Sequence, residues 1–258
     1  MNNKSFSFFK RIVSLAPSIT ETLFACGFGD RIVGRTQQCD WPERCASIPV
    51  VGGFSTVKVE EIYAMKPDLV YGTTLHKRLL DKVKKSGIMV ATIPPYPVFK
   101  APSMIKCIGM VTGAEQEFEA LAECVQSEIA SVKNTVTDQP SKVVCYLCNF
   151  HCQSWYDCCI AASIEFMNCK LAGRRTGENT HSIIEKIVAD SPELILVPRC
   201  RRCSEECINP LLSTDNQLSR FIHDKKIPVC TLKSKLLARS GPRAGQALRG
   251  LAHSLFGL

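Results

Sequence analysis

The chain has 258 residues, of which 45% are hydrophobic, so it can bury one large core or two smaller ones. No apolar run approaches the roughly 20 residues that a membrane-spanning helix requires, and no transmembrane segment is expected. The formal net charge of +8 is diffuse. Its densest cluster, Arg199 to Arg202, contains no aromatic residue, which argues against a nucleic-acid partner because such sites combine dense positive charge with stacking groups.

The N-terminal residues MNNKSFSFFKRIVSL lack the pattern of a secretory signal peptide, because Lys10 and Arg11 interrupt the apolar stretch and no small-residue cleavage site follows. A cytoplasmic location is therefore expected, with a periplasmic or other extracytoplasmic location if a leader has been removed. The chain has 15 cysteines, an odd number that cannot all pair in disulfides. In a reducing compartment, such a set favours metal or redox chemistry.

In chain order, the hydrophobic patterns predict strands that alternate with helices. Strands are predicted at 11–15, 31–34, 67–72, 88–93, 142–147, 193–197 and 227–232. Helices are predicted at 18–27, 57–65, 76–86, 103–111, 158–171, 182–190, 212–223 and 242–256. This alternation predicts an α/β fold in which parallel sheets are covered by helices on both faces.

A long helix is predicted in the middle of the chain, from Thr112 to about Val136, because its apolar residues recur at alternating spacings of three and four. Thr112-Gly-Ala-Glu115 has the pattern of a capping box, as does Ser18-Ile-Thr-Glu21 earlier in the chain. At 1.5 Å per residue the helix would be roughly 35 Å long. We therefore expect two lobes, residues 1–111 and 141–258, joined by a connecting segment at 112–140.

Two segments repeat one pattern of helix, proline, acidic residue and apolar strand: VEEIYAMKPDLVYG at 59–72 and IIEKIVADSPELILV at 183–197. Together with RIVSLAPSITETLFACG at 11–27 and VGRTQQCDWPE at 33–43, they resemble the helical-backbone (class III) substrate-binding proteins. The chain is most similar to the periplasmic vitamin B12-binding family, and relatives that bind siderophores or haem share the fold. The resemblance implies two Rossmann-like lobes joined by one rigid helix, with the ligand in the cleft between them.

The same resemblance implies a set of ligand-binding residues. Cys39 matches a cysteine or serine in the cleft loop of the family, and Asp40 lies beside it. Aromatic walls for a large ring ligand such as cobalamin are expected from Trp41, Phe54 and Trp155, with core packing as an equal alternative for Phe54.

The family docks on the membrane subunits of an ABC transporter through one acidic residue on each lobe. The matching positions here are Glu60 and Glu185. The alternative for both is an ordinary solvated glutamate, and Glu185 also fits a capping position. A cytoplasmic copy could not meet the external face of a transporter, so this partner depends on the location.

The second lobe departs from the family in its cysteines. Cys145-x2-Cys148-x3-Cys152 and Cys200-x2-Cys203-x3-Cys207 follow two predicted strands, and a pair stands at 158–159. Short spacings let one loop supply several thiolates to a soft metal, which favours an iron–sulfur cluster and, less strongly, zinc. The expected metal ligands are Cys148, Cys152, Cys158, Cys159, Cys200, Cys203 and Cys207. Cysteines at 26, 107, 124 and 230 are expected to be buried as small hydrophobic groups.

Three functions are consistent with these patterns. The first is a binding protein that holds a corrinoid or a metal centre in the cleft. The second is a cytosolic iron–sulfur redox protein or electron carrier on the same fold, and the third is structural zinc in a transporter component. The sequence contains no recognised catalytic motif, which favours binding over catalysis.

Overall fold

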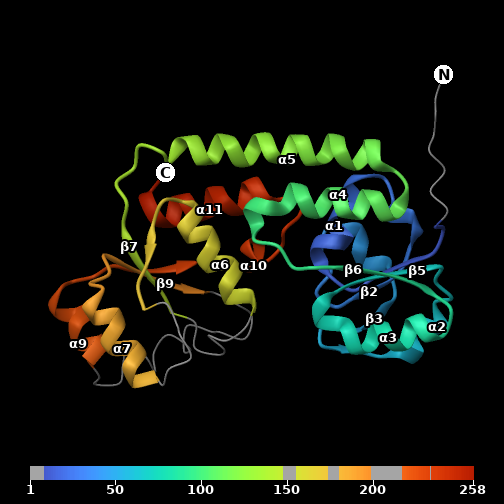
Figure 1. Cartoon of the computed structure of the whole chain (residues 1–258), viewed down its shortest axis with the longest axis horizontal. Coiled ribbons are helices and arrows are strands. Elements are labelled where there is room, and N and C mark those ends of the chain that lie inside the picture. Colours follow the sequence, from blue (N-terminus) through green and yellow to red (C-terminus); the bar gives the residue numbers. More distant parts are fainter. Residues whose placement is uncertain (1–8, 148–154, 174–179, 199–216, 233) are drawn as a thin grey trace. The chain divides into compact units, whose positions relative to one another are not determined.

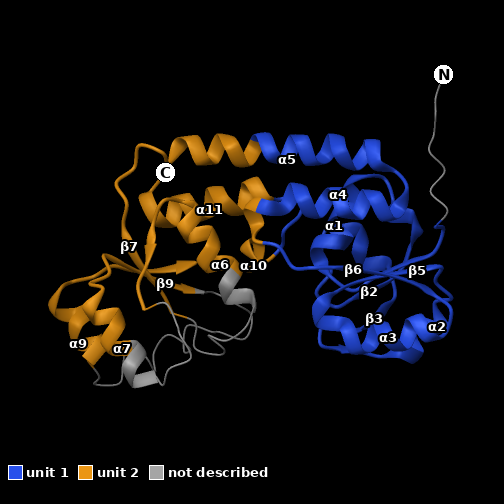
Figure 2. Ribbon diagram, in the orientation of Figure 1, with its two compact units in different colours: residues 1–96, 100–127, 239–243 blue, residues 97–99, 128–238, 244–258 orange. Residues whose placement is uncertain are grey.

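The computed structural model describes residues 9–147, 155–173, 180–198, 217–232 and 234–258. It divides into two compact units, which Figure 2 shows in different colours. Unit 1 consists of Met1–Tyr96, Lys100–Ser127 and Arg239–Arg243, and unit 2 of Pro97–Phe99, Glu128–Ala238 and Ala244–Leu258. No helix in these described ranges is long and apolar enough to cross a membrane.

Unit 1 is built on a sheet with the strand order β4-β3-β2-β1-β5-β6. The pairs are parallel except for β3 with β4, which form an antiparallel edge. The strands are β1 (Ile12–Ser14), β2 (Ile32–Thr36), β3 (Val50–Gly53), β4 (Thr56–Val57), β5 (Leu69–Thr73) and β6 (Met89–Ile93). Residues of β1 and β5 are buried, as expected for central parallel strands covered on both faces.

Helices cover both faces of this sheet, as Figure 1 shows: α1 and α4 lie on one face and α2 and α3 on the other. The helices of unit 1 are α1 (Pro17–Ala25), α2 (Val59–Ala64), α3 (Lys77–Lys85), α4 (Ala101–Thr112) and the first part of α5 (Glu115–Thr135). Short 3-10 turns stand at Gly29–Arg31, Glu43–Ser47, Thr74–His76 and, in the connection to α4, Val98–Lys100. The prediction of an α/β fold with helices on both faces is confirmed.

The long helix starts later than predicted. Gly113 has a φ of 70° and ends α4 in the left-handed conformation that favours glycine. The hydroxyl of Thr112 donates backward, to the carbonyls of Ile108 (3.1 Å) and Gly109 (2.9 Å), so the predicted capping box at Thr112 is wrong. The predicted apolar stripe is confirmed except at Leu121, which is half-buried; its other residues in and around α5 are buried: Ala114, Phe118, Ala122, Val125, Ile129, Val132 and Val136.

Unit 2 is built on a parallel sheet with the order β10-β9-β7-β8. Its strands are β7 (Val143–Tyr146), β8 (Lys170–Leu171), β9 (Leu194–Pro198) and β10 (Val229–Leu232). Its helices are the last part of α5, α6 (Trp155–Phe166), α7 (Thr180–Ala189), α9 (Gln217–Asp224), α10 (Ser234–Leu237) and α11 (Ala244–Phe256). The helix predicted over 158–171 is wrong at its end, because the chain turns at Asn168 (φ 65°) and residues 170–171 pair with β7.

The internal repeat is visible in the backbone as well as in the sequence. In each unit a helix, α2 or α7, is followed by a proline and then by a central strand, β5 or β9. The residue before each proline has a left-handed backbone, with φ of 46° at Lys66 and 49° at Ser191. The prediction that the segments 59–72 and 183–197 correspond is therefore supported by the same turn in both.

The acidic residue after each proline makes the same kind of hydrogen bond in both units. The carboxylate of Asp68 accepts hydrogen bonds from the backbone amides of Lys10 (2.7 Å) and Arg11 (3.0 Å), just before β1. The carboxylate of Glu193 accepts one from the amide of Val143 (3.1 Å), the first residue of β7. Each carboxylate thus satisfies donors at the start of the neighbouring strand, which fixes the register of each parallel pair.

Candidate functional site

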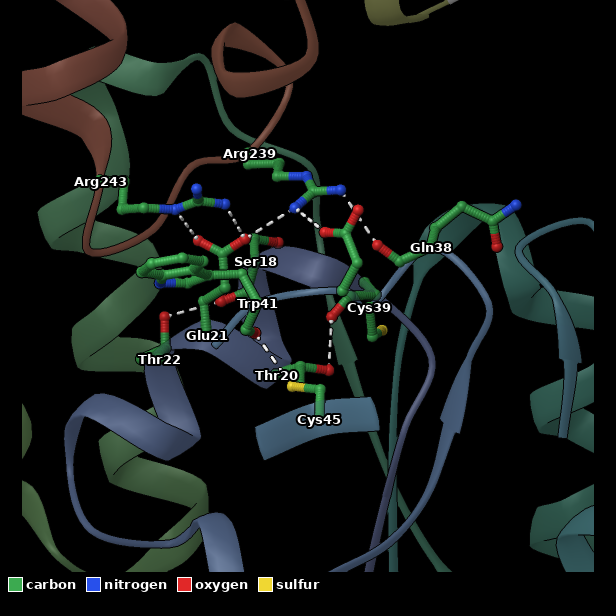
Figure 3. A network of polar contacts seen from close by, with 12 residues as sticks. Ser18, Thr20, Glu21, Thr22, Gln38, Cys39, Trp41, Cys45, Arg239 and Arg243 are labelled. Atoms are coloured by element: carbon green, nitrogen blue, oxygen red, sulfur yellow. Dashed lines mark hydrogen bonds and ion pairs between the residues drawn. The ribbon is translucent and has the colours of Figure 1, made fainter. Parts of the chain in front are cut away.

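The candidate site lies at the carboxyl edge of the sheet in unit 1, where open parallel sheets bind ligands. The connections after β1, β2, β3 and β5 all leave the sheet at this edge. The segment 239–243 returns to the same place from the far end of the sequence and contributes two arginines (Figure 3). The site therefore combines residues that are more than 200 positions apart in the chain.

Glu21 is the buried centre of this arrangement, with a side chain that is 1% exposed. It lies in α1, whose N-cap is Ala16, with Pro17 at the first helical position. The predicted capping box at Ser18 is therefore wrong, since Ser18 and Glu21 are inside the helix and the Glu21 carboxylate has other partners. It accepts hydrogen bonds from Arg243 Nη2 (2.7 Å), Arg243 Nε (2.9 Å) and Arg239 Nη1 (3.0 Å).

Arg239 connects this buried carboxylate to the loop after β2. Its Nη1 also donates to the Asp40 carboxylate (2.7 Å), and its Nη2 donates to the carbonyl of Gln38 (3.0 Å). Burial alone would lower the pKa of Arg239, but hydrogen bonds and charge from Asp40 and Glu21 raise it above its ordinary value. Arg239 is therefore a permanent cation that holds the Asp40 carboxylate in place.

Trp41 lies next to Asp40 and is 48% exposed. The Arg243 guanidinium stands over its ring at 4.8 Å from the ring centroid, in cation–π geometry (Figure 3). The thiol of Cys45 donates to the backbone carbonyl of Trp41 (3.1 Å), and Arg35 Nε donates to the carbonyl of Cys45 (2.6 Å). The loop is therefore fixed from below while much of the indole faces solvent.

Cys39 is fully buried beneath the same loop. Its sulfur lies 3.2 Å from the hydroxyl of Thr36 and 3.9 Å from the carbonyl of Ser14. Burial raises the pKa of Cys39, and it raises that of Cys45 to about 11, so both thiols are protonated at neutral pH. In this position Cys39 supports the loop, and its predicted contact with a ligand stays a prediction.

Phe54 is half-buried in the turn between β3 and β4, at the same edge. Its amide donates to the side-chain carbonyl of Gln38 (2.7 Å), and its ring packs on His76 with centroids 4.6 Å apart. His76 Nδ1 accepts from the amide of Thr73 (3.1 Å), so its Nε2 carries the proton and donates to the carbonyl of Phe54 (2.9 Å). Burial lowers the pKa of His76, which keeps the ring neutral and preserves its hydrogen bond to the turn that contains Phe54.

The described part of the site presents side chains suited to non-covalent binding of a ligand. It offers an exposed indole, a half-buried phenyl ring and one carboxylate fixed by a buried arginine. Flat apolar walls with a few fixed polar groups are typical of small-molecule sites. No group of three or more potential metal ligands occurs among the residues that the structure describes.

The predicted metal ligands fall mostly outside the described ranges: Cys148, Cys152, Cys200, Cys203 and Cys207. Trp155 and Cys158 belong to α6 by their backbone, and their side chains are outside what the structure describes. Cys159 is 2% exposed within unit 2, as is expected of a core residue, and Cys145 belongs to an apolar cluster of that unit. The expected metal centre stays a prediction.

Two further groups of predicted residues have definite positions. Glu60 and Glu185 are both exposed, on α2 and α7, the helices that precede the repeated prolines. Among the cysteines expected to be buried, Cys124 is exposed on α5 and three others are half-buried: Cys26, Cys107 and Cys230. That expectation is wrong for Cys124, because position 124 lies off the apolar stripe of the helix.

Sequence patterns alone did not identify Glu21, Arg239, Arg243, Gln38 or His76 as parts of the site. Glu21 fits a capping pattern equally well, and its arginine partners are 218 and 222 positions away. An arginine near a Gly-Pro turn is normally a solvated surface residue. Only the repeat of arginine on either side of Ser240-Gly-Pro242 could have drawn attention to this segment.

Comparison with known proteins assigns the fold and the sequence to a family. A sequence profile of that family, described as "Periplasmic binding protein", matches residues 12–206. The chain belongs to the periplasmic binding protein family. This agrees with the family predicted from the segments at 11–27, 33–43 and 59–72.

Curated relatives of this periplasmic binding protein match over part of their length. It is 32% identical over 129 residues to the uncharacterized ABC transporter substrate-binding lipoprotein YvrC of Bacillus subtilis, covering 48% of this chain and 41% of that one. It is 31% identical over 83 residues to the vitamin B12-binding protein of Vibrio parahaemolyticus, covering 31% and 30%. The chain thus spans less than half the length of these relatives. A lipoprotein relative gives no support to the expected cytoplasmic location.

Solved structures show the same fold over nearly the whole chain. The periplasmic heme-binding protein RhuT from Roseiflexus sp. RS-1 has a TM-score of 0.79 and 24% identity, with 96% of this chain and 98% of that chain covered. The periplasmic vitamin B12-binding protein BtuF of Vibrio cholerae has a TM-score of 0.71 and 18% identity, with 96% of each chain covered. The predicted α/β fold with two parallel-sheet lobes is confirmed.

Proposed function

We propose that this periplasmic binding protein is the substrate-binding component of an ABC transporter and that it binds a metal-bearing macrocycle, a corrinoid or a haem. The observation that carries the proposal is Trp41, a 48% exposed indole at the carboxyl edge of the sheet, next to the fixed Asp40 carboxylate. The names of the vitamin B12-binding and heme-binding relatives support the same ligand class. The expectation that the ligand lies between two lobes stays a prediction.

The chemistry of these residues suits such a ligand. When a large ring stacks on an indole and a phenyl ring, apolar surface of both partners is removed from water. This burial stabilises the complex by roughly 25 cal/mol for each Å². Peripheral amide groups of a corrinoid can donate to Asp40, which the buried Arg239 holds. Binding of this kind needs no covalent step, in agreement with a transport role.

Isothermal titration calorimetry with the purified protein tests the ligand class. The panel is hydroxocobalamin, hemin and a ferric siderophore, each titrated separately. The proposal expects 1:1 binding of hydroxocobalamin or hemin. Binding of the siderophore alone would overturn the macrocycle, and binding of none of the three would overturn the function.

The partner in this proposal is the pair of membrane subunits of an ABC importer, and the location is therefore extracytoplasmic. Glu60 and Glu185 are the proposed contacts, each exposed on a helix at matching positions of the internal repeat. Reversing charge at a docking pair, E60K and E185K, is expected to weaken binding to the importer by roughly 2–5 kcal/mol, or 30-fold or more. E61K, an exposed neighbour on α2, is the control and should bind normally.

A metal centre on the cysteines of unit 2 remains a separate part of the proposal. The sequence pattern at 145–152 and 200–207 supports an iron–sulfur cluster, which would favour the redox alternative, or zinc, which would favour the structural one. Elemental analysis and a visible spectrum of protein purified without oxygen distinguish these two. Protein without iron or zinc, handled in this way, would refute both.

A further inference from the structure

We infer that Arg243 and Glu21 are positioning residues for Trp41: their ion pair holds the guanidinium over one face of the indole and so fixes the ring for ligand binding. This inference rests on the proposed function, in which Trp41 contacts the ligand. None of the comparisons assigns a role to either residue. Both belong to unit 1, although Arg243 comes from the far end of the chain.

The guanidinium is fixed because Glu21 holds it at two points. Arg243 donates from Nε to Glu21 Oε2 (2.9 Å) and from Nη2 to Glu21 Oε1 (2.7 Å). A two-point contact between a planar guanidinium and a planar carboxylate sets the orientation of the arginine plane. Since the Glu21 side chain is 1% exposed and also binds Arg239, the carboxylate itself has no freedom to turn.

The fixed guanidinium in turn restricts the indole. It lies 4.8 Å from the ring centroid of Trp41, in the range of a cation–π contact. The backbone of Trp41 is fixed independently, since its carbonyl accepts from the thiol of Cys45 (3.1 Å). Because the backbone and one ring face of Trp41 are both held, the 48% exposed indole already has few accessible orientations before a ligand binds. A ligand that stacks on it therefore pays little of the ordering entropy that binding normally costs.

The expected size of the effect follows from the contact that is lost. Substituting Arg243 by lysine keeps the positive charge but removes the planar fork, so it cannot hold both oxygens of Glu21 and cover the ring at once. We expect R243K to weaken ligand binding by about two- to five-fold, which corresponds to the ~0.5–1 kcal/mol of a cation–π contact at an exposed site. R243Q, which loses the charge as well, should show at least the same loss.

The first experiment measures the indole directly and needs no ligand. The chain has two tryptophans, so W155F leaves Trp41 as the only one. In that background, R243K and R243Q are expected to raise the acrylamide quenching constant of Trp41 and lower its fluorescence anisotropy. The control is R249Q, which removes an arginine on α11 whose partner is Glu128 in unit 2, and it should change neither. Unchanged quenching in both Arg243 variants would overturn the inference, and if R243Q does not fold, R243K decides alone.

The second experiment asks whether Arg243 acts through Trp41, in a double-mutant cycle on otherwise unmodified protein. The affinities for hydroxocobalamin and hemin are measured for the parent, R243K, W41A and the double variant. The inference expects the R243K loss to disappear in the W41A background, whereas an equal loss in both backgrounds would contradict it. If the parent binds neither probe, the proposed function fails, while altered quenching would still support the positioning of Trp41.

Discussion

Replacing Glu21 by glutamine should destabilise unit 1 strongly, although the side chains have nearly the same shape. The variant removes the charge that faces both Arg239 and Arg243 while leaving both guanidiniums in place. Arg239 has a side chain that is only 7% exposed, so it cannot recover the lost interaction from water. Arg239 does retain its ion pair with Asp40, in which Nη1 lies 2.7 Å from Oδ1.

The magnitude follows from this geometry. Removing one partner of a buried ion pair costs about 3–5 kcal/mol, and the remaining contact with Asp40 places E21Q near the lower end. In a protein of this size, ~3 kcal/mol lowers the melting temperature by about 6–12 °C. The surface pair of Glu128 and Arg249, with side chains 40% and 56% exposed, provides the contrast. Such pairs contribute roughly 0–1 kcal/mol, so E128Q should shift the melting temperature by about 4 °C at most.

Thermal unfolding followed by far-UV circular dichroism is the appropriate assay, because it reports on both units, and Glu21 lies in unit 1 whereas Glu128 lies in unit 2. A double variant, E21Q with R243Q, should lose less than the sum of the two single losses, since it removes both members of one partly buried pair. Equal shifts for E21Q and E128Q would contradict this prediction, because they would mean that the burial of Glu21 has no energetic consequence.

Three further predictions follow from single contacts. Burial lowers the pKa of His76, so as the pH falls the unfolded chain takes up a proton on this residue before the folded chain does. The stability of the fold is therefore full above the unfolded pKa of about 6.5 and decreases as the pH falls below it. In pH-jump unfolding, H76Q should remove this dependence, whereas H223Q, at an exposed position, should retain it. G109A would bring a methyl group to 2.6 Å from Phe118 Cβ and should lower the free energy of unfolding by about 1–3 kcal/mol. G250A, with open space around it, should raise the free energy of unfolding by roughly 0.5–1 kcal/mol. Equal melting temperatures of the two variants would contradict the close packing of α4 on α5. Iodoacetamide should modify the exposed Cys124 well before Cys39 and Cys45, as mass spectrometry of native protein would show, and equal rates would mean that the two buried thiols are accessible.

The sequence was sufficient for the elements and the fold class because each depends on local patterns. The apolar stripe of α5 predicted which residues are buried, and the repeated helix–proline–strand pattern predicted two related sheets. Element ends were less accurate where two signals compete. Thr112 and Ser18 both precede a glutamate at the spacing of a capping box, but Gly113 ends a helix and Pro17 starts one, and these backbone restrictions decide the boundary.

The site could be predicted only in part, for a physical reason. Asp40 and Trp41 were identified because they lie in one short motif that resembles the family. Glu21 and Arg243 were not, because an ion pair between positions 222 residues apart leaves no local pattern in a single sequence. Cys39 belongs to the same motif and is fully buried in the loop, so its contact with a ligand stays a prediction.

The most direct test of the account is the affinity of the W41A variant for the macrocycle that the parent protein binds. Loss of a large apolar contact should weaken binding by ~1.5–3 kcal/mol, or about 10- to 150-fold, with little change in melting temperature because the indole is exposed. M110A, which truncates a 67% exposed side chain on α4, is the matched control and should bind as the parent does. Equal affinities for W41A and the parent would show that the ligand does not bind at the carboxyl edge of this sheet.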